Sequence, residues 1–134
     1  MGAIGYGSFM NDDALEWIST LEGSEGFEAI SEAFDAVFEE GDFMEPSVAF
    51  EALAAAEVIA AMLGQSAPDL PDEVTTWAAG KKPPKATLIK KAQRAVKLVA
   101  RDSGLNDSWI DPDGPAHWQE HVNGVLQRLS ADAA

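Results

Sequence analysis

The sharpest chemical pattern in the sequence is "HWQEH", because His117, Glu120 and His121 match the H-x-x-E-H spacing of inverted zinc proteases. On a helix, histidines at i and i+4 share one face and can bind one metal ion. A protease would need a further protein ligand and a sizeable substrate cleft, yet only thirteen residues follow His121. The simpler interpretation is an exposed or half-buried pair in an amphipathic helix. A small metal-binding or ligand-binding, enzyme-like domain that uses these three residues is therefore our alternative hypothesis.

Other catalytic patterns are incomplete. The chain has no cysteine, so thiol nucleophiles, thiolate metal sites and disulfides are excluded. It contains no G-x-S-x-G motif for serine chemistry. The segment Asp111–Gly114 lacks the remaining ligands of a calcium loop and predicts a turn instead. We expect no cofactor, and the balance of the motifs favours a protein that is not an enzyme.

The charge is strongly segregated along the chain. The net charge is −14, and residues 1–80 contain 17 acidic residues but no Lys or Arg. Eight of the nine basic residues lie within residues 81–101. Such a field repels phosphate backbones over most of the surface, so nucleic-acid binding is not expected. A basic protein is the partner that this distribution favours.

The acidic residues of the second predicted helix form a stripe opposite its apolar residues. The stripe comprises Glu25, Glu28, Glu32, Asp35 and Glu39. A basic stripe follows at i, i+4, i+7 and i+11 in the predicted helix over residues 85–102, formed by Lys90, Arg94, Lys97 and Arg101. Either the two stripes are solvated or paired within the chain, or the acidic stripe is a docking face for a basic partner. The docking face is our first hypothesis, with an immunity-like or regulatory role by analogy only.

The glycine-rich start, "GAIGYGSFMNDDALEW", could be a phosphate loop or a helix start. It lacks the G-x-G-x-x-G spacing, a preceding strand and a lysine. We instead predict that Asn11 caps the first helix, that Asp12 lies in its first turn, and that Phe9 is buried beneath it. Gly5 and Gly7 would let this N-terminal arm lie close to the body of the protein.

The motif Gly5-x-Gly7-x-Phe9-x-Asn11-Asp12 resembles the start of an uncharacterised bacterial domain-of-unknown-function family, DUF4259. The resemblance continues more weakly through "LP" at residues 70–71 and "SGLNDSWIDPDGPAHW" at residues 103–118, so it covers nearly the whole chain. Family members usually carry Trp where this chain has Ile4. The resemblance implies a fold and a length but no activity. The position of its motif at the very N-terminus suggests a small stand-alone protein.

The apolar periodicity predicts an all-α protein: one compact domain over residues 1–134, with about six helices and an N-terminal Gly-rich arm. The predicted helices span 12–22, 24–41, 46–63, 72–79, 85–102 and 115–129, with 46–63 at the centre because it is rich in alanine. On the first helix we assign Leu15, Trp17, Ile18 and Leu21 to the apolar side. The predicted buried residues are Trp17, Phe34, Leu53, Ile59, Trp77, Val96, Trp109 and Trp118. No membrane span or signal peptide is expected, so we predict a cytoplasmic location, and the sequence leaves the oligomeric state open.

Overall fold

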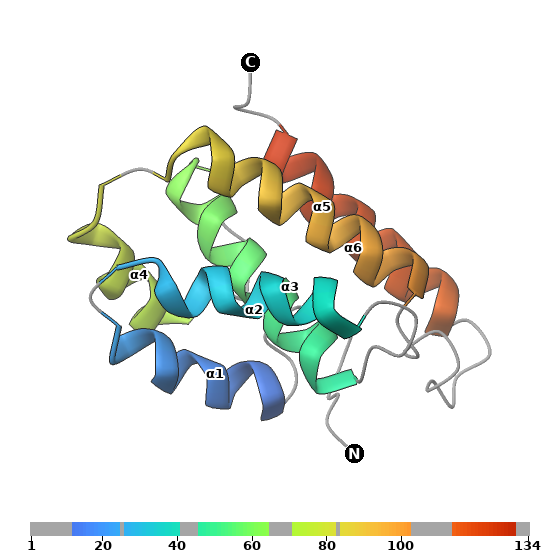
Figure 1. The fold of residues 1–134 in the computed structure, drawn as a ribbon, viewed down its shortest axis with the longest axis horizontal. Helices are drawn as coiled ribbons and strands as arrows, with labels where there is room; N and C mark the ends of the chain where they lie inside the picture. Colours follow the sequence, from blue (N-terminus) through green and yellow to red (C-terminus); the bar gives the residue numbers. More distant parts are fainter. Residues whose placement is uncertain are drawn as a thin grey trace.

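The computed structural model describes residues 12–24, 26–40, 46–64, 71–82, 84–102 and 114–130. These ranges hold six α-helices and no strand, which confirms the all-α prediction (Figure 1). The helices are α1 (Asp12–Glu22), α2 (Glu28–Glu40), α3 (Pro46–Met62), α4 (Asp72–Ala79), α5 (Ala86–Asp102) and α6 (Gly114–Ser130). The glycine-rich arm lies outside the described residues. The assignment of the whole chain to one domain remains a prediction.

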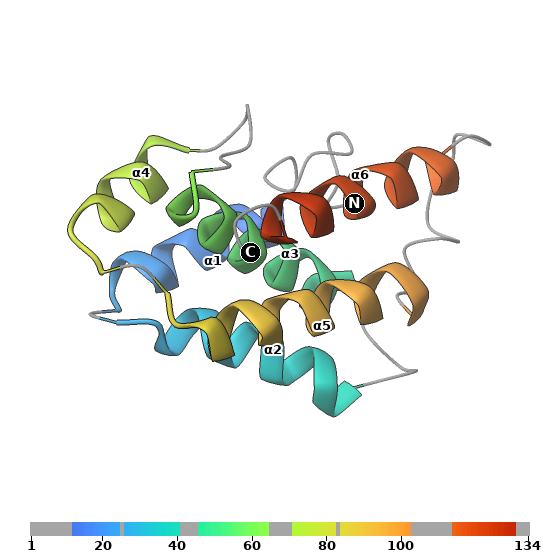
Figure 2. The ribbon, with the colours of Figure 1, turned by 90° about the horizontal axis from the view of Figure 1, so that it is seen from above.

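Helix α3 is the centre of the fold, as its composition predicted. All its residues from Ala52 to Ala60 are buried, and it contacts each of the other five helices. Figure 2 shows α3 with α2 and α5 along one side and α1, α4 and α6 around the rest. Alanine side chains are short, so the neighbouring helices can approach the α3 backbone closely. Larger side chains such as Leu53 and Ile59 fill the spaces between them.

Helix α1 turns Ala14, Trp17, Ile18 and Leu21 toward the core, at the i, i+3, i+4, i+7 spacing of one face. Leu15 was assigned to the same face, and this was wrong, because 45% of it is exposed. A residue directly after Ala14 is turned by roughly 100° around the helix axis, which carries it off the buried stripe. Trp17 is buried as predicted.

Helix α2 begins at Glu28, four residues later than the predicted start at Ser24. The Ser24 carbonyl accepts a hydrogen bond from the Trp77 indole Nε1 at 3.0 Å, so it is engaged outside the helix. The Gly26 amide donates to the Glu28 side chain at 3.2 Å, which supplies a partner at the real start. The hydrogen bond from Trp77 of α4, a residue distant in the sequence, therefore holds Ser24 in the connection between α1 and α2.

Helices α5 and α6 run antiparallel, and α2 runs beside α5 in the same direction (Figure 2). The described buried residues of α5 and α6 are Ala92, Ala95, Val96, Val99, Val122, Val125 and Leu129. The Gln93 side-chain amide donates to the Leu129 carbonyl at 3.3 Å and joins the two helices near the end of α6. Within the described ranges no helix combines the length and the apolar character needed to cross a bilayer.

Six of the eight predicted core residues are confirmed as buried: Trp17, Phe34, Leu53, Ile59, Trp77 and Val96. Trp109 lies outside the described residues. The backbone of Trp118 is part of α6, but its side chain is outside the described set. The confirmed residues all lie on stripes of helical spacing, which is the signal that selected them.

Candidate functional site

The predicted acidic stripe is exposed on α2. Glu28, Glu32, Asp35 and Glu39 all lie on the solvent side, while Glu25 lies outside the described residues. Asp35 is the member that the structure shows in an ion pair, with Lys91 of α5 at 2.6 Å. The stripe therefore presents several carboxylates to solvent from a single helix.

Lys91 shows that α5, the basic helix, neutralises part of the acidic stripe of α2. Its Nζ atom lies between the Asp35 carboxylate and the Ser31 hydroxyl, to which it donates at 2.8 Å. Lys91 is not a member of the predicted basic stripe, in which Lys90, Arg94 and Lys97 are exposed. Pairing within the chain thus uses a lysine from the side of α5 that faces α2. Among the described residues, Lys90, Arg94 and Lys97 form no ion pair with the acidic stripe.

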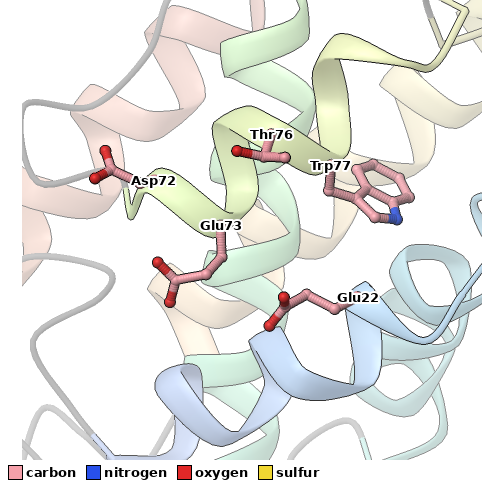
Figure 3. Close-up of a pocket in the computed structure, with 5 residues that line it drawn as sticks. All are labelled: Glu22, Asp72, Glu73, Thr76 and Trp77. Carbon is pink, nitrogen blue, oxygen red and sulfur yellow. The ribbon is translucent and has the colours of Figure 1, made fainter.

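A second acidic feature, which the sequence analysis missed, lies between α1 and α4. A shallow hollow of about 380 Å³ is lined by Glu22 at the end of α1 and by Asp72, Glu73, Thr76 and Trp77 of α4. In Figure 3 the side chains of Glu22 and Glu73 extend from the two helices toward the space between them. All three carboxylates are exposed, but the Asp72 side chain extends away from the space that Glu22 and Glu73 face (Figure 3). Two like charges directed toward one space favour a cation between them.

Trp77 fixes the position of α4 beside this hollow. Besides the hydrogen bond to Ser24, its ring meets Phe27 edge to face, with centroids 6.0 Å apart and planes at 77°. The Lys81 ammonium lies 4.9 Å from the Trp77 ring centroid. The Trp77 ring, which is one of the residues that line the hollow, is therefore also in contact with a cation of this chain.

Sequence reasoning missed this hollow because its residues are about fifty positions apart in the chain. One local signal was available, since Pro71 followed by Asp72 and Glu73 is a typical helix start with acidic residues in the first turn. The sequence could place those two carboxylates on one helical turn. It could not show that Glu22 comes to lie across from Glu73.

The metal hypothesis rests on residues that the structure describes only in part. Helix α6 carries His117, Glu120 and His121 at the predicted i, i+3, i+4 spacing. Glu120 is exposed and His121 is half-buried, whereas the side chain of His117 lies outside the described set. Among the described side chains, no three His, Cys, Asp or Glu residues are grouped as metal ligands. Metal binding by this motif remains a prediction.

The N-terminal motif is likewise untested. Helix α1 begins at Asp12, at the predicted position. Gly5, Gly7, Phe9 and Asn11 lie outside the described residues, as does the side chain of Asp12. The Asn11 cap and the burial of Phe9 therefore remain predictions.

Comparison with known proteins identifies a family without an assigned role. No curated protein and no solved structure matches the chain. One family model, described as "Domain of unknown function (DUF4259)", matches residues 2–121. This match includes all of α1 to α5 and the first part of α6. The chain therefore belongs to the DUF4259 family.

Proposed function

We propose that this protein is a non-catalytic interaction module whose acidic surface binds a basic protein partner. We define the acidic surface by its exposed carboxylates on α1, α2 and α4: Glu16, Glu22, Glu28, Glu32, Glu39, Asp72 and Glu73. The observation that carries the proposal is the charge segregation along the chain. The first 80 residues contain no Lys or Arg, and α1, α2 and α4 all lie within them. Asp35 is left out of the surface because Lys91 partly neutralises it.

The arrangement of the helices supports an acidic surface that extends over one end of the molecule, with α1 between α4 and α2 (Figure 2). In Figure 1, α4, α1 and the start of α2 lie together, while α5 and α6 lie toward the other side of the molecule. The Trp77–Ser24 hydrogen bond ties α4 to the turn between α1 and α2. A basic partner that approaches this side meets carboxylates from three helices, and their combined field accelerates the encounter.

The hollow between α1 and α4 is the best anchoring point within the acidic surface. It combines the carboxylates of Glu22, Asp72 and Glu73 with the aromatic wall of Trp77. A Lys or Arg side chain of the partner would gain charge-assisted hydrogen bonds there.

The test is a pull-down that compares matched charge reversals. Immobilised wild-type protein, Glu73→Lys and Glu120→Lys are incubated with cell lysate at about 0.1 M and about 0.5 M NaCl, and the bound proteins are identified. Both substitutions change the net charge by the same amount at an exposed helical position. Glu120, however, belongs to α6 and lies outside the acidic surface. We expect a basic protein to bind the wild type and Glu120→Lys at low salt, and to be lost with Glu73→Lys or at high salt.

Two results would contradict the proposal. One is equal recovery of every bound protein by Glu73→Lys and by the wild type. The other is recovery of no protein at either salt concentration, together with stoichiometric zinc binding that disappears when His117 and His121 are replaced by Ala. The second result would establish the metal hypothesis in place of the docking hypothesis.

A further inference from the structure

A small hollow of mixed character lies where α2 and α5 run side by side. It has a volume of about 240 Å³ and is lined by Phe38 of α2 and by Arg94, Lys97 and Leu98 of α5. Phe38 and Leu98 are half-buried, whereas Arg94 and Lys97 are exposed. The hollow therefore combines two apolar side chains with two positive charges.

The neighbouring contacts separate this hollow from the ion pair between the same helices. Lys91, about one turn before Arg94, is directed to Asp35 and Ser31, which lie about one and two turns before Phe38. The Arg94 guanidinium carbon lies over the Phe38 ring, 5.4 Å from its centroid, so a cation–π contact helps to orient this cation. Within the described chain, neither Arg94 nor Lys97 forms an ion pair.

We propose that this hollow binds an acidic polypeptide segment. One carboxylate of the segment pairs with Arg94 and Lys97, and a neighbouring apolar side chain packs on Phe38 and Leu98. Arginine suits this role because its planar guanidinium can stack on an aromatic ring and still donate hydrogen bonds to a carboxylate. This inference is independent of the proposed function, because the hollow shares no residue with the acidic surface.

The overall charge of −14 does not prevent such binding, since ions screen charges separated by more than about 8–10 Å at physiological salt. A short acidic segment that reaches only the hollow experiences mainly the two nearby cations. A nucleic-acid duplex is a poorer occupant, because its charges follow at intervals of about 1.7 Å and extend well beyond the hollow. Its phosphates would approach the exposed carboxylates of Glu32 and Glu39 on the adjacent helix.

The test is an NMR titration of the isotope-labelled protein with an acetylated, amidated pentapeptide of sequence ELEFE. We expect saturable shifts of the Lys97 and Leu98 amides, and none with the neutral peptide QLQFQ. Lys97→Glu should weaken the binding by about tenfold, because it removes one charge-assisted hydrogen bond and adds a like charge. Lys90→Glu is the matched control, since Lys90 is exposed on the same helix but does not line the hollow, and it should change the affinity by less than about twofold.

Three outcomes would overturn the inference. The first is the absence of saturable shifts up to about 5 mM ELEFE. The second is equal weakening by Lys97→Glu and Lys90→Glu, which would mean that only the general charge of α5 matters. The third is tighter binding of a twelve-nucleotide thymidine oligonucleotide at the same amides, which would make the hollow a nucleic-acid site. The spectrum of each variant without peptide reports whether it is folded, and Lys97→Gln replaces Lys97→Glu if the latter is not.

Discussion

Arg128 of α6 and Glu57 of α3 form a two-pronged ion pair at the centre of the protein. The Arg128 Nη2 atom donates to Glu57 Oε2 at 3.1 Å, and Nη1 donates to Oε1. Glu57 is 0% exposed, and the Arg128 side chain is 24% exposed. The pair is therefore a buried carboxylate held by a partly buried guanidinium that reaches it from the last helix.

Removal of Arg128 should be among the most damaging single changes to the stability of the fold. Arg128→Met leaves the Glu57 carboxylate buried without its guanidinium partner, so we expect a loss of about 3–5 kcal/mol in the free energy of unfolding. Urea denaturation followed by circular dichroism measures this loss. The control is the double variant Glu57→Leu with Arg128→Met, which removes both charges and should recover most of the lost stability. A double variant no more stable than Arg128→Met would show that the pair is not the source of the loss.

The ion pair between Lys91 and Asp35 should contribute far less. The side chains are 29% and 54% exposed, so water screens the attraction. We expect Lys91→Met to lower the free energy of unfolding by no more than about 1 kcal/mol. This difference should shrink when the denaturation is repeated at about 0.5 M NaCl. A salt-independent loss as large as that of Arg128→Met would contradict the prediction.

Trp77 should stabilise the position of α4 mainly through its ring and its indole N–H. Trp77→Phe keeps an aromatic ring but removes the donor to the Ser24 carbonyl, so we expect a loss of about 1 kcal/mol. Trp77→Ala also removes the buried ring and should cost about 3–5 kcal/mol. Lys81→Met tests the cation over the ring alone, with an expected loss of about 0.5 kcal/mol. Thermal or urea unfolding ranks the three variants, and a different order would contradict these assignments.

Two exposed glycines offer a matched test of backbone conformation. Gly64, after α3, has φ +86°, whereas Gly80, after α4, has φ −93°. A Cβ atom added at either position meets nothing within 4 Å, so sterics beyond the residue itself do not distinguish them. Gly64→Ala should cost about 1 kcal/mol because L-residues disfavour positive φ. Gly80→Ala should change the stability by less than about 0.5 kcal/mol or raise it slightly. Equal effects in urea denaturation would contradict this explanation.

The helices and their buried faces could be predicted largely from the sequence. Helix α4 spans the predicted residues 72–79, and α1, α3, α5 and α6 agree to within one residue at each end. The spacing of apolar residues and the caps are local signals, so they act before any tertiary contact exists. The prediction was wrong at two places. Leu15 is exposed because the core lies in another direction from the helix axis, and the start of α2 differs where Ser24 contacts Trp77 of α4.

The candidate binding sites were less predictable. The sequence alone determined the charge segregation and the acidic stripe of α2, because both follow from residue type and helical spacing. Glu57 is also the single charged residue in the apolar stretch of residues 52–64, a pattern that indicates a need for a partner of opposite charge. Only the tertiary structure decided that Arg128, 71 positions away, is its partner, and that Glu22 faces Glu73 across a hollow. Which helix faces meet depends on packing that minimises exposed apolar area over the whole chain, and no local pattern encodes that choice.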